Sequence, residues 1–117
     1  TSLGQLRYLS CIKHVDGMIG NSSSGLLEAP SLHKGTVNIG DRQRGRLCAD
    51  SVISCPADYA SITRSIDQLL SPSFLALLPK VESPYGNGGA SQAIVKILEQ
   101  KTFNDLLKKK FFDLDCV

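Results

Sequence analysis

Hydrophobic residues recur along the first part of the chain in two spacings, one typical of a helix and one of a buried strand. Leucine and isoleucine return about every third residue from Leu3 to Ile12. This spacing predicts an amphipathic helix over residues 3–13, with Ser2 available as its N-cap. The run from Val15 to Ile19 is almost wholly apolar, which predicts a short strand buried on both faces, as in a parallel sheet.

Helices and strands continue to alternate after this first pair. The pattern predicts a helix over residues 25–33 that Pro30 interrupts, and then a second strand at Thr36–Ile39 that runs into a glycine. A third strand at Ser51–Ser54 precedes a helix that Asp58 caps. The apolar residues expected on the buried face of that helix are Ile62, Ile66, Leu69 and Leu70.

Strands that alternate with helices predict an α/β fold, in which right-handed crossovers build a parallel sheet. Three strands are few for such a sheet, since doubly wound domains carry about five or six. We therefore expect that further strands precede Thr1. The chain would then be a fragment of a longer protein. The expected architecture is a Rossmann-like parallel sheet with flanking helices over residues 1–82, incomplete at its N-terminus.

The remaining residues, 83–117, are expected to form a loop and C-terminal helices. Residues 71–91 are rich in proline, serine and glycine, which favours loops around a single helical turn. Apolar residues at helical spacing predict a helix around Ile94. Thr102 with Asp105 matches a capping box and predicts the start of a last helix.

Composition narrows the classes of function without naming one. A net charge of +2 over 117 residues is too small to indicate binding to nucleic acid or to a membrane surface. No apolar stretch approaches the length of a transmembrane helix. The absence of tryptophan and the aromatic content of 6% argue against a platform for stacking bases.

Cysteine and histidine residues give no sign of a metal centre. The cysteines are Cys11, Cys48, Cys55 and Cys116, and none forms a Cys-x-x-Cys pair. This spacing argues against a zinc site and is typical of reduced thiols in a cytoplasmic protein. We expect no cofactor. His14 and His33 have no evident partners for a catalytic triad.

The first candidate for chemistry is the glycine- and serine-rich segment Gly20–Gly25, here called the serine turn. It follows the first strand and precedes a helix. The N–H groups and hydroxyls of such a turn suit an anion, although the serines could equally serve only as a helix cap. A P-loop is excluded because no Gly-Lys-Ser/Thr is present. A nucleophile elbow around Ser22 would need glycine where Ser24 stands.

Two charged residues are expected near this turn. Glu28 either caps the helix from position N3, if Gly25 is the N-cap, or accepts hydrogen bonds from a ribose diol. Arg42 follows the second strand and so belongs to the same carboxyl edge of the sheet, where open α/β sheets bind ligands. Its guanidinium could pair with a phosphate or a base carbonyl. Alternatively, Arg42, Arg44 and Arg46 form a solvated basic loop.

Several segments together resemble the hydrolysing UDP-N-acetylglucosamine 2-epimerases, over most of the chain. They are Tyr8–Ser10, the serine turn, Glu28–Pro30, Val37–Arg46 and Pro84–Ser91. The Gly-Asp-Arg-Gln-x-Gly-Arg segment within Val37–Arg46 separates this branch from the non-hydrolysing epimerases. Two places depart from the family pattern: His33-Lys34-Gly35 replaces a Gly-Lys-Pro-like turn, and Cys48 stands where a basic residue is common.

The resemblance implies a two-domain, glycosyltransferase-B-like protein whose active site lies between two Rossmann-like domains, with this chain forming most of the second. It implies that Ser22 and Ser23 contact the diphosphate of UDP. Glu28 would contact the ribose and Arg42 the UDP moiety. The family's acid and base carboxylates lie mainly in the first domain, so no catalytic residue is expected in this chain.

The reaction that the resemblance implies begins with proton abstraction at C2 and loss of UDP from C1. Water then adds to the glycal intermediate, which yields UDP and N-acetylmannosamine for sialic acid-type sugars. The expected partners are a UDP-sugar and the missing N-terminal domain of the same polypeptide, without which the chain would be inactive. Apolar surface over residues 90–112 is expected to cause association or disorder at this end when that domain is absent. A homo-oligomer is therefore possible.

Two other functions stay open at this point. The chain could be a free-standing UDP-sugar-binding or regulatory module, or a structural remnant that binds nothing. The sugar is also open, because a diacetamido sugar is an alternative to N-acetylglucosamine.

Overall fold

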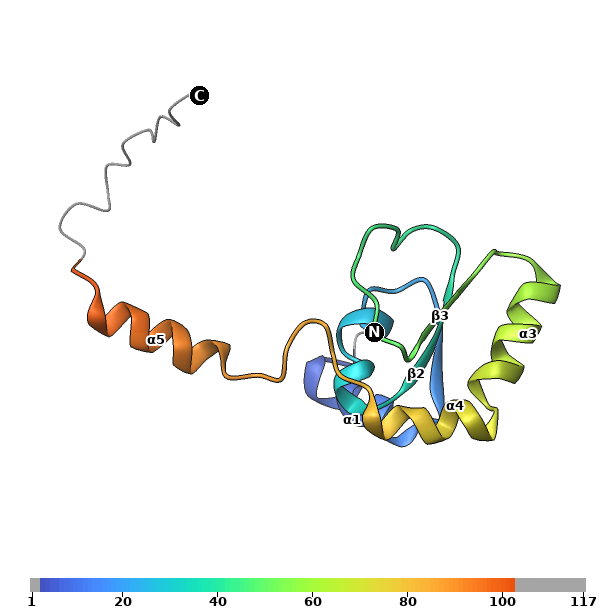
Figure 1. Cartoon of the computed structure of the whole chain (residues 1–117), viewed down its shortest axis with the longest axis horizontal. Helices are drawn as coiled ribbons and strands as arrows, with labels where there is room; N and C mark the ends of the chain where they lie inside the picture. Colours follow the sequence, from blue (N-terminus) through green and yellow to red (C-terminus); the bar gives the residue numbers. More distant parts are fainter. Residues whose placement is uncertain (1–2, 103–117) are drawn as a thin grey trace, which may run out of the picture. The chain divides into compact units, whose positions relative to one another are not determined.

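The computed structural model shown in Figure 1 describes residues 3–102 of the chain. The chain divides into two compact units, the first ending at Asn87 and the second beginning at Gly88. The division into domains made above from the sequence, after residue 82, remains a prediction. Thr102 is the last described residue, so the expected last helix lies outside the described part.

The first unit alternates helices and strands, as the hydrophobic pattern predicts. Its elements are α1 (Gln5–His14), β1 (Gly17–Gly20), α2 (Ser24–Leu27), the 3-10 turn η1 (Pro30–Leu32), β2 (Gly35–Ile39), β3 (Val52–Cys55), α3 (Tyr59–Leu69), α4 (Pro72–Leu77) and the 3-10 turn η2 (Leu78–Lys80). The strands form a parallel sheet in the order β1-β2-β3. The α/β class and the parallel sheet are therefore confirmed.

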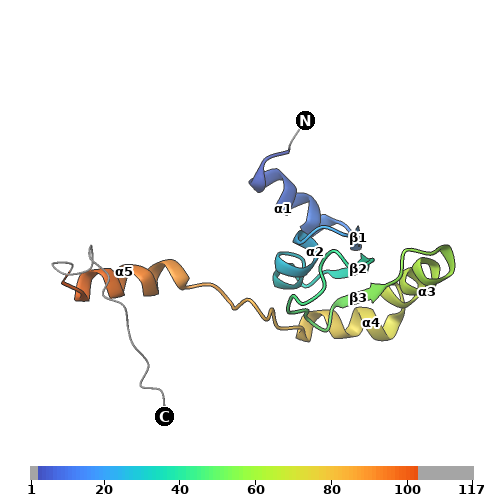
Figure 2. The ribbon, with the colours of Figure 1, turned by 90° about the horizontal axis from the view of Figure 1, so that it is seen from above.

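Alternate residues of the central strand β2 face opposite layers of helices, as the two-residue period of a strand requires. Thr36 faces α2, because its hydroxyl donates to the backbone oxygen of Gly25 over 2.9 Å. Val37 faces the other way, into a core with Cys55, Leu69, Phe74 and Leu78. Figure 2 accordingly shows α2 on one side of the strands and α3 with α4 on the other.

A pair of glycines lets α3 approach the sheet closely. Gly17 of β1 and Gly35 of β2 are register partners. A Cβ atom built on Gly17 would lie 2.8 Å from Leu69 Cδ2, and one built on Gly35 would lie 2.8 Å from Phe74 Cε1. The bare backbone at these two positions therefore makes room for the core side chains of α3 and α4.

The expectation that the first strand is buried on both faces is wrong. Within residues 3–102, β1 pairs only with β2 and forms an edge of the sheet. The side chain of Ile19 is 55% exposed. An apolar run identifies a strand, but the burial of its two faces depends on which helices pack over them, and the run itself does not contain that information.

The interruption expected at Pro30 is confirmed, but the α-helix within residues 25–33 is shorter than expected. Helix α2 is a single turn that ends at Leu27, and a separate 3-10 turn begins at Pro30. Proline has no N–H to donate to a preceding turn, so the α-helical ladder does not continue through position 30. His33 closes the second turn in the left-handed conformation, with a φ of 53°, and its Nδ1 lies 3.1 Å from the backbone oxygen of Leu78.

Helix α3 begins where the sequence predicts. The Asp58 carboxylate accepts a hydrogen bond from the backbone N–H of Ser61 at 2.9 Å, which confirms the N-cap. Leu69 is buried and Ile62 and Ile66 pack partly against the core. Leu70 was expected on the same face, but it is the C-cap residue and is 52% exposed.

The cap predicts how acid affects stability. The hydrogen bond from the Ser61 backbone is the main reason that the pKa of Asp58 lies below its ordinary value of 3.8. A group whose pKa is lower in the folded state stabilises that state above the unfolded pKa and loses this effect as the pH falls through the folded pKa. We therefore expect Asp58→Asn, which caps without titrating, to lose less stability than the unsubstituted chain between pH 6 and pH 2.5.

Thermal unfolding of both proteins at the two pH values measures this difference. An equal loss in the two proteins would show that the Asp58 cap does not contribute to the acid response.

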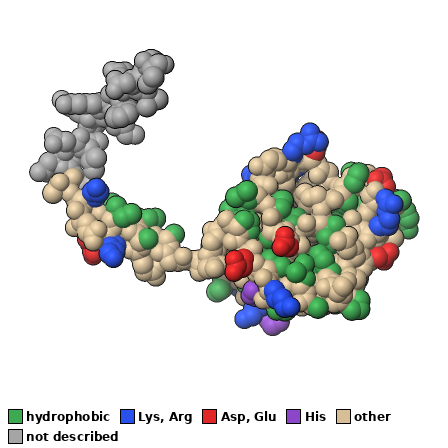
Figure 3. Space-filling model, in the orientation of Figure 1, with side chains coloured by type: hydrophobic (Ala, Val, Ile, Leu, Met, Phe, Trp, Pro, Cys, Tyr) green, Lys and Arg blue, Asp and Glu red, His purple; other side chains and the backbone are tan. Residues whose placement is uncertain are grey.

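The second unit contains helix α5 (Ala90–Gln100), which confirms the helix expected around Ile94. None of its residues is buried. Ile94, Val95, Ile97 and Leu98 are all about half exposed, and apolar side chains appear along one side of α5 in Figure 3. Among the described helices of both units, none is long and apolar enough to cross a membrane.

Candidate functional site

The serine turn lies at the carboxyl end of β1 and leads directly into α2. Gly20 is the last residue of β1 and is paired in register with Asn38 of β2. Helix α2 begins at Ser24, with Ser23 in the N-cap position. The Ser23 side chain makes no capping hydrogen bond. Ser23 therefore does not cap α2 through its side chain.

Ser22 and Ser23 both have donors available for a ligand. No acceptor within residues 3–102 receives a hydrogen bond from their backbone N–H groups or their hydroxyls. The Ser22 hydroxyl oxygen does accept a bond from the backbone N–H of Ser24, at 3.3 Å. Because α2 is a single turn, its dipole is small, and binding of an anion here would depend mainly on these individual donors.

A tight contact with the central strand holds the turn in place. Gly25 is buried, and a Cβ atom built on it would lie 2.5 Å from Thr36 Cγ2. The next residue, Leu26, is fully buried. The serine turn is thus anchored to β2 at Gly25, while Ser22 remains exposed.

The basic loop after β2 is connected to the serine turn by a buried side chain. Residues 41–46 form successive turns, within which Gln43 is only 6% exposed. Its Nε2 donates to the backbone oxygen of Asn21 over 2.7 Å. Since Arg42 precedes Gln43 and Ser22 follows Asn21, this bond brings the basic loop beside the serine turn. The prediction that both lie at one edge of the sheet is confirmed by the parallel register of β1 and β2.

Arg42 itself is exposed and makes no hydrogen bond or ion pair with any described residue. Arg44 and Arg46 are exposed as well. The far end of the loop is held by the Tyr85 hydroxyl, which donates to the backbone oxygen of Leu47 at 3.0 Å. The Arg42 guanidinium is therefore free to reach a ligand from a backbone that is fixed on both sides.

Glu28 does not cap from position N3, so that expectation is wrong. Because α2 starts at Ser24 rather than after Gly25, Glu28 is the C-cap residue and lies one helical turn beyond Ser24. The Ser24 hydroxyl donates to Glu28 Oε2. The Tyr8 hydroxyl of α1 in turn donates to Ser24 Oγ over 2.7 Å.

A pocket of about 350 Å³ opens beside this carboxylate. It is lined by Leu3, Gly4, Gln5, Tyr8 and Glu28. The pocket therefore has both apolar surface and a carboxylate, the combination that small-molecule sites use for affinity and orientation.

Sequence reasoning missed the contributions of Gln43, Tyr8 and Ser24. In the sequence, Gln43 and Tyr8 stand out only as members of the segments that carry the resemblance. Ser24 is not distinguished there from the other serines of the turn. No local pattern in the sequence distinguishes Gln43 from the other polar residues of this loop. Nothing in the sequence shows that Tyr8 meets Ser24, because that contact depends on how α1 packs.

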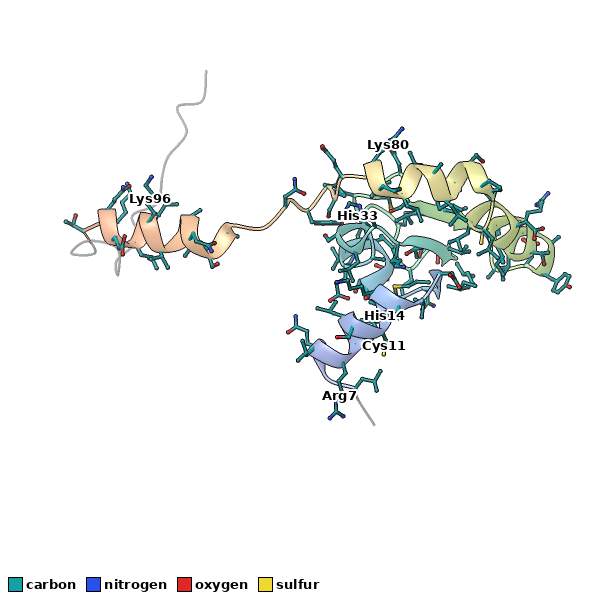
Figure 4. The ribbon with its side chains drawn as sticks, turned by 90° about the horizontal axis from the view of Figure 1, so that it is seen from below. Arg7, Cys11, His14, His33, Lys80 and Lys96 are labelled. Atoms are coloured by element: carbon teal, nitrogen blue, oxygen red, sulfur yellow. The ribbon has the colours of Figure 1, made fainter. Side chains whose placement is uncertain are left out.

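The two histidines lie apart from this site. In Figure 4, His14 lies at the end of α1 and His33 lies on a different segment. No cluster of histidine, cysteine or acidic side chains suited to a metal ion occurs within residues 3–102. Among the cysteines that the structure describes, Cys11 and Cys48 are exposed free thiols and Cys55 is a buried one.

Comparison with known proteins identifies a family. The sequence model described as UDP-N-acetylglucosamine 2-epimerase matches residues 1–99. The polysialic acid biosynthesis protein P7 of Escherichia coli is 41% identical over 88% of this chain and 25% of its own length. A GDP/UDP-N,N'-diacetylbacillosamine 2-epimerase (hydrolyzing) of Campylobacter jejuni is 37% identical over 97% of this chain and 29% of its own length.

A third relative has a similar name and a similar coverage. The UDP-N,N'-diacetylbacillosamine 2-epimerase (hydrolyzing) of Legionella pneumophila is 33% identical over 79% of this chain and 23% of its own length. The chain thus spans about a quarter of the length of these curated relatives. Because the family model matches nearly the whole chain, the chain belongs to the UDP-N-acetylglucosamine 2-epimerase family.

Proposed function

We propose that this chain belongs to the UDP-binding half of a hydrolysing UDP-N-acetylglucosamine 2-epimerase. In this proposal Ser22 and Ser23 bind the diphosphate, Glu28 binds the ribose and Arg42 pairs with the UDP moiety. The observation that supports it most directly is the hydrogen bond from Gln43 to the backbone of Asn21. That bond brings unpaired serine donors and an unpaired guanidinium to one place on the sheet edge.

The arrangement suits a diphosphate as a leaving group. When UDP departs from C1 of the sugar, negative charge increases on its terminal phosphate. Donors that are already oriented towards this charge stabilise it without reorganisation. The N–H and hydroxyl groups of Ser22 and Ser23 would supply such donors, and the Arg42 guanidinium would supply a positive charge.

The position of Glu28 is consistent with a sugar rather than a phosphate neighbour. A carboxylate repels phosphate, but it accepts two hydrogen bonds from a vicinal diol. Glu28 opens onto the pocket beside α1. Ser24, whose hydroxyl is bonded to Glu28, separates the carboxylate from the donors of Ser22 and Ser23 along the chain.

The chemical steps would need groups from a longer protein. Proton abstraction at C2 and addition of water require an acid and a base, which we place in an N-terminal domain of the same polypeptide. The chain on its own would then bind UDP without turning over substrate. N-acetylmannosamine for sialic acid-type sugars is the proposed product.

A diacetamido sugar is the second candidate substrate. The relatives from Campylobacter jejuni and Legionella pneumophila are both named for N,N'-diacetylbacillosamine. Both candidates are UDP-linked amino sugars and would leave the same UDP in the serine turn.

Titration calorimetry of the chain with UDP, UMP and uridine tests the proposal. We expect affinity to fall in that order, because each lost phosphate removes partners of the serine donors. Ser23→Ala is expected to weaken UDP binding about tenfold, the usual effect of a hydrogen bond to a charged group, and to leave uridine unaffected. Ser31→Ala, on the exposed surface of η1, is the matched control.

Binding of UDP and uridine with equal affinity would contradict the assignment of the diphosphate to the serine turn. A chain that binds no UDP would rule out the free-standing binding module and would contradict the proposal that these residues bind UDP by themselves. Binding that Arg42→Ala abolishes would exclude the structural remnant.

A further inference from the structure

We propose that Tyr8 and Ser24 are positioning residues that hold the Glu28 carboxylate in the orientation needed to accept hydrogen bonds from the ribose hydroxyls. The inference rests on the proposed function, because it assigns a task to residues around the same nucleotide. Neither Tyr8 nor Ser24 is proposed to contact the phosphates.

The three side chains form a continuous chain of hydrogen bonds. The Tyr8 hydroxyl donates to Ser24 Oγ at 2.7 Å, and the Ser24 hydroxyl donates to Glu28 Oε2. All three residues are partly buried. The first bond joins α1 to α2, across 16 positions in the sequence, and the second joins residues one helical turn apart.

The direction of these bonds leaves only one acceptor for the hydroxyl hydrogen of Ser24. A serine hydroxyl has a single hydrogen. Because Tyr8 donates to the Ser24 oxygen, that hydrogen is directed to the carboxylate. Ser24 therefore has no hydrogen left to donate to a phosphate, which distinguishes it from Ser22 and Ser23.

The same geometry specifies which carboxylate oxygen is open. Oε2 of Glu28 is occupied by Ser24, while Oε1 has no donor among the described residues. A glutamate side chain is otherwise free to rotate, and that freedom would be lost on binding. Fixing the carboxylate before the ligand arrives lowers this loss, as preorganised sites do. Tyr8 and Glu28 also line the same pocket, so the fixed carboxylate faces a space that a ribose could enter.

The experiment compares UDP with 2',3'-dideoxyuridine diphosphate, which keeps the base and the diphosphate but lacks the diol. Both are titrated into the chain and into its Tyr8→Phe and Ser24→Ala variants. Tyr8→Phe keeps the ring and removes only the hydroxyl. Tyr59→Phe is the matched control, because Tyr59 is 87% exposed and its hydroxyl makes no hydrogen bond with any residue that the structure describes.

We expect Tyr8→Phe to weaken UDP binding about three- to tenfold, the usual range for one hydrogen bond, and to leave the affinity for the dideoxy analogue unchanged. Ser24→Ala is expected to show the same selective loss, and Tyr59→Phe no loss. A role in folding alone would lower both affinities together, because the analogue shares every other contact.

The inference is overturned if Tyr8→Phe weakens both ligands equally or neither. The unsubstituted chain tests the proposed function separately. If it binds no UDP, the UDP-binding assignment fails. If it binds UDP and the dideoxy analogue equally, the assignment of Glu28 to the ribose fails, and the inference fails with it.

Discussion

Arg42→Ala is expected to weaken binding of UDP to this chain by about 10- to 100-fold. A hydrogen bond between charged groups contributes about 1.5–3 kcal/mol, and each 1.4 kcal/mol changes affinity tenfold. Arg42 is exposed and has no partner among residues 3–102, so its removal leaves no buried group unpaired. The loss should therefore appear in binding and not in stability.

The same loop supplies the controls for this experiment. Arg44→Ala removes an equal charge from an exposed position two residues away and is expected to have only a small, salt-sensitive effect. Arg42→Lys keeps the charge but loses the planar fork, so its affinity should fall between those of the unsubstituted chain and Arg42→Ala. Calorimetry measures the affinities, and circular dichroism checks the fold. Equal losses for Arg42→Ala and Arg44→Ala would indicate a general effect of the basic loop.

Gly25→Ala is expected to destabilise the first unit by about 1–3 kcal/mol, the usual cost of inserting a methyl group into a filled site. Alanine is a better helix former than glycine by about 1 kcal/mol, so propensity alone predicts the opposite sign. The contact between the new methyl group and Thr36 decides the sign of the change in stability. The new Cβ atom would lie 2.5 Å from Thr36 Cγ2, and Thr36 cannot turn away without losing its bond to the Gly25 backbone oxygen.

A double-mutant cycle isolates this contact. Thr36→Ser removes the methyl group and keeps the hydroxyl, so Gly25→Ala should cost less in the Thr36→Ser background than in the unsubstituted chain. Chemical denaturation of the four proteins measures the coupling. If the cost of Gly25→Ala is the same in both backgrounds, the clash with Thr36 is not its cause.

The displacement of α2 that Gly25→Ala causes is also expected to affect the ligand site. Gly25 closes the serine turn, so displacement of α2 would move Ser22 and Ser23 relative to the Arg42 loop. A weaker affinity for UDP in Gly25→Ala that Thr36→Ser partly restores would connect the packing beneath the turn to binding above it.

Some features of this protein could be predicted because their causes are local. The Asp58 cap, the second strand and the apolar face of α3 depend on residues a few positions apart. The serine turn and the Arg42 loop could be placed at one sheet edge because strands in a parallel sheet end on the same side. The three-stranded parallel sheet follows from the alternation of strands and helices.

The predictions of other features were wrong or absent because the causes of those features lie far apart in the chain. The exposure of Ile19 depends on whether a helix from a distant part of the chain packs over its face of β1. The role of Glu28 depends on where α2 begins, and a shift of that start to Ser24 turned an expected N-terminal capping residue into a C-cap residue.

The amino-acid sequence by itself determined the α/β class, the order of the elements, the family and the four residues proposed to bind UDP. Only the tertiary structure decided how those residues are held. Gln43 reaches Asn21 across 22 positions, and Tyr8 reaches Ser24 across 16. Contacts of this kind need the packing of whole elements against one another, and no local spacing of residue types encodes them. The serine turn can therefore be recognised in the sequence. The hydrogen bonds that Gln43 and Tyr8 make to it are seen only in the folded chain.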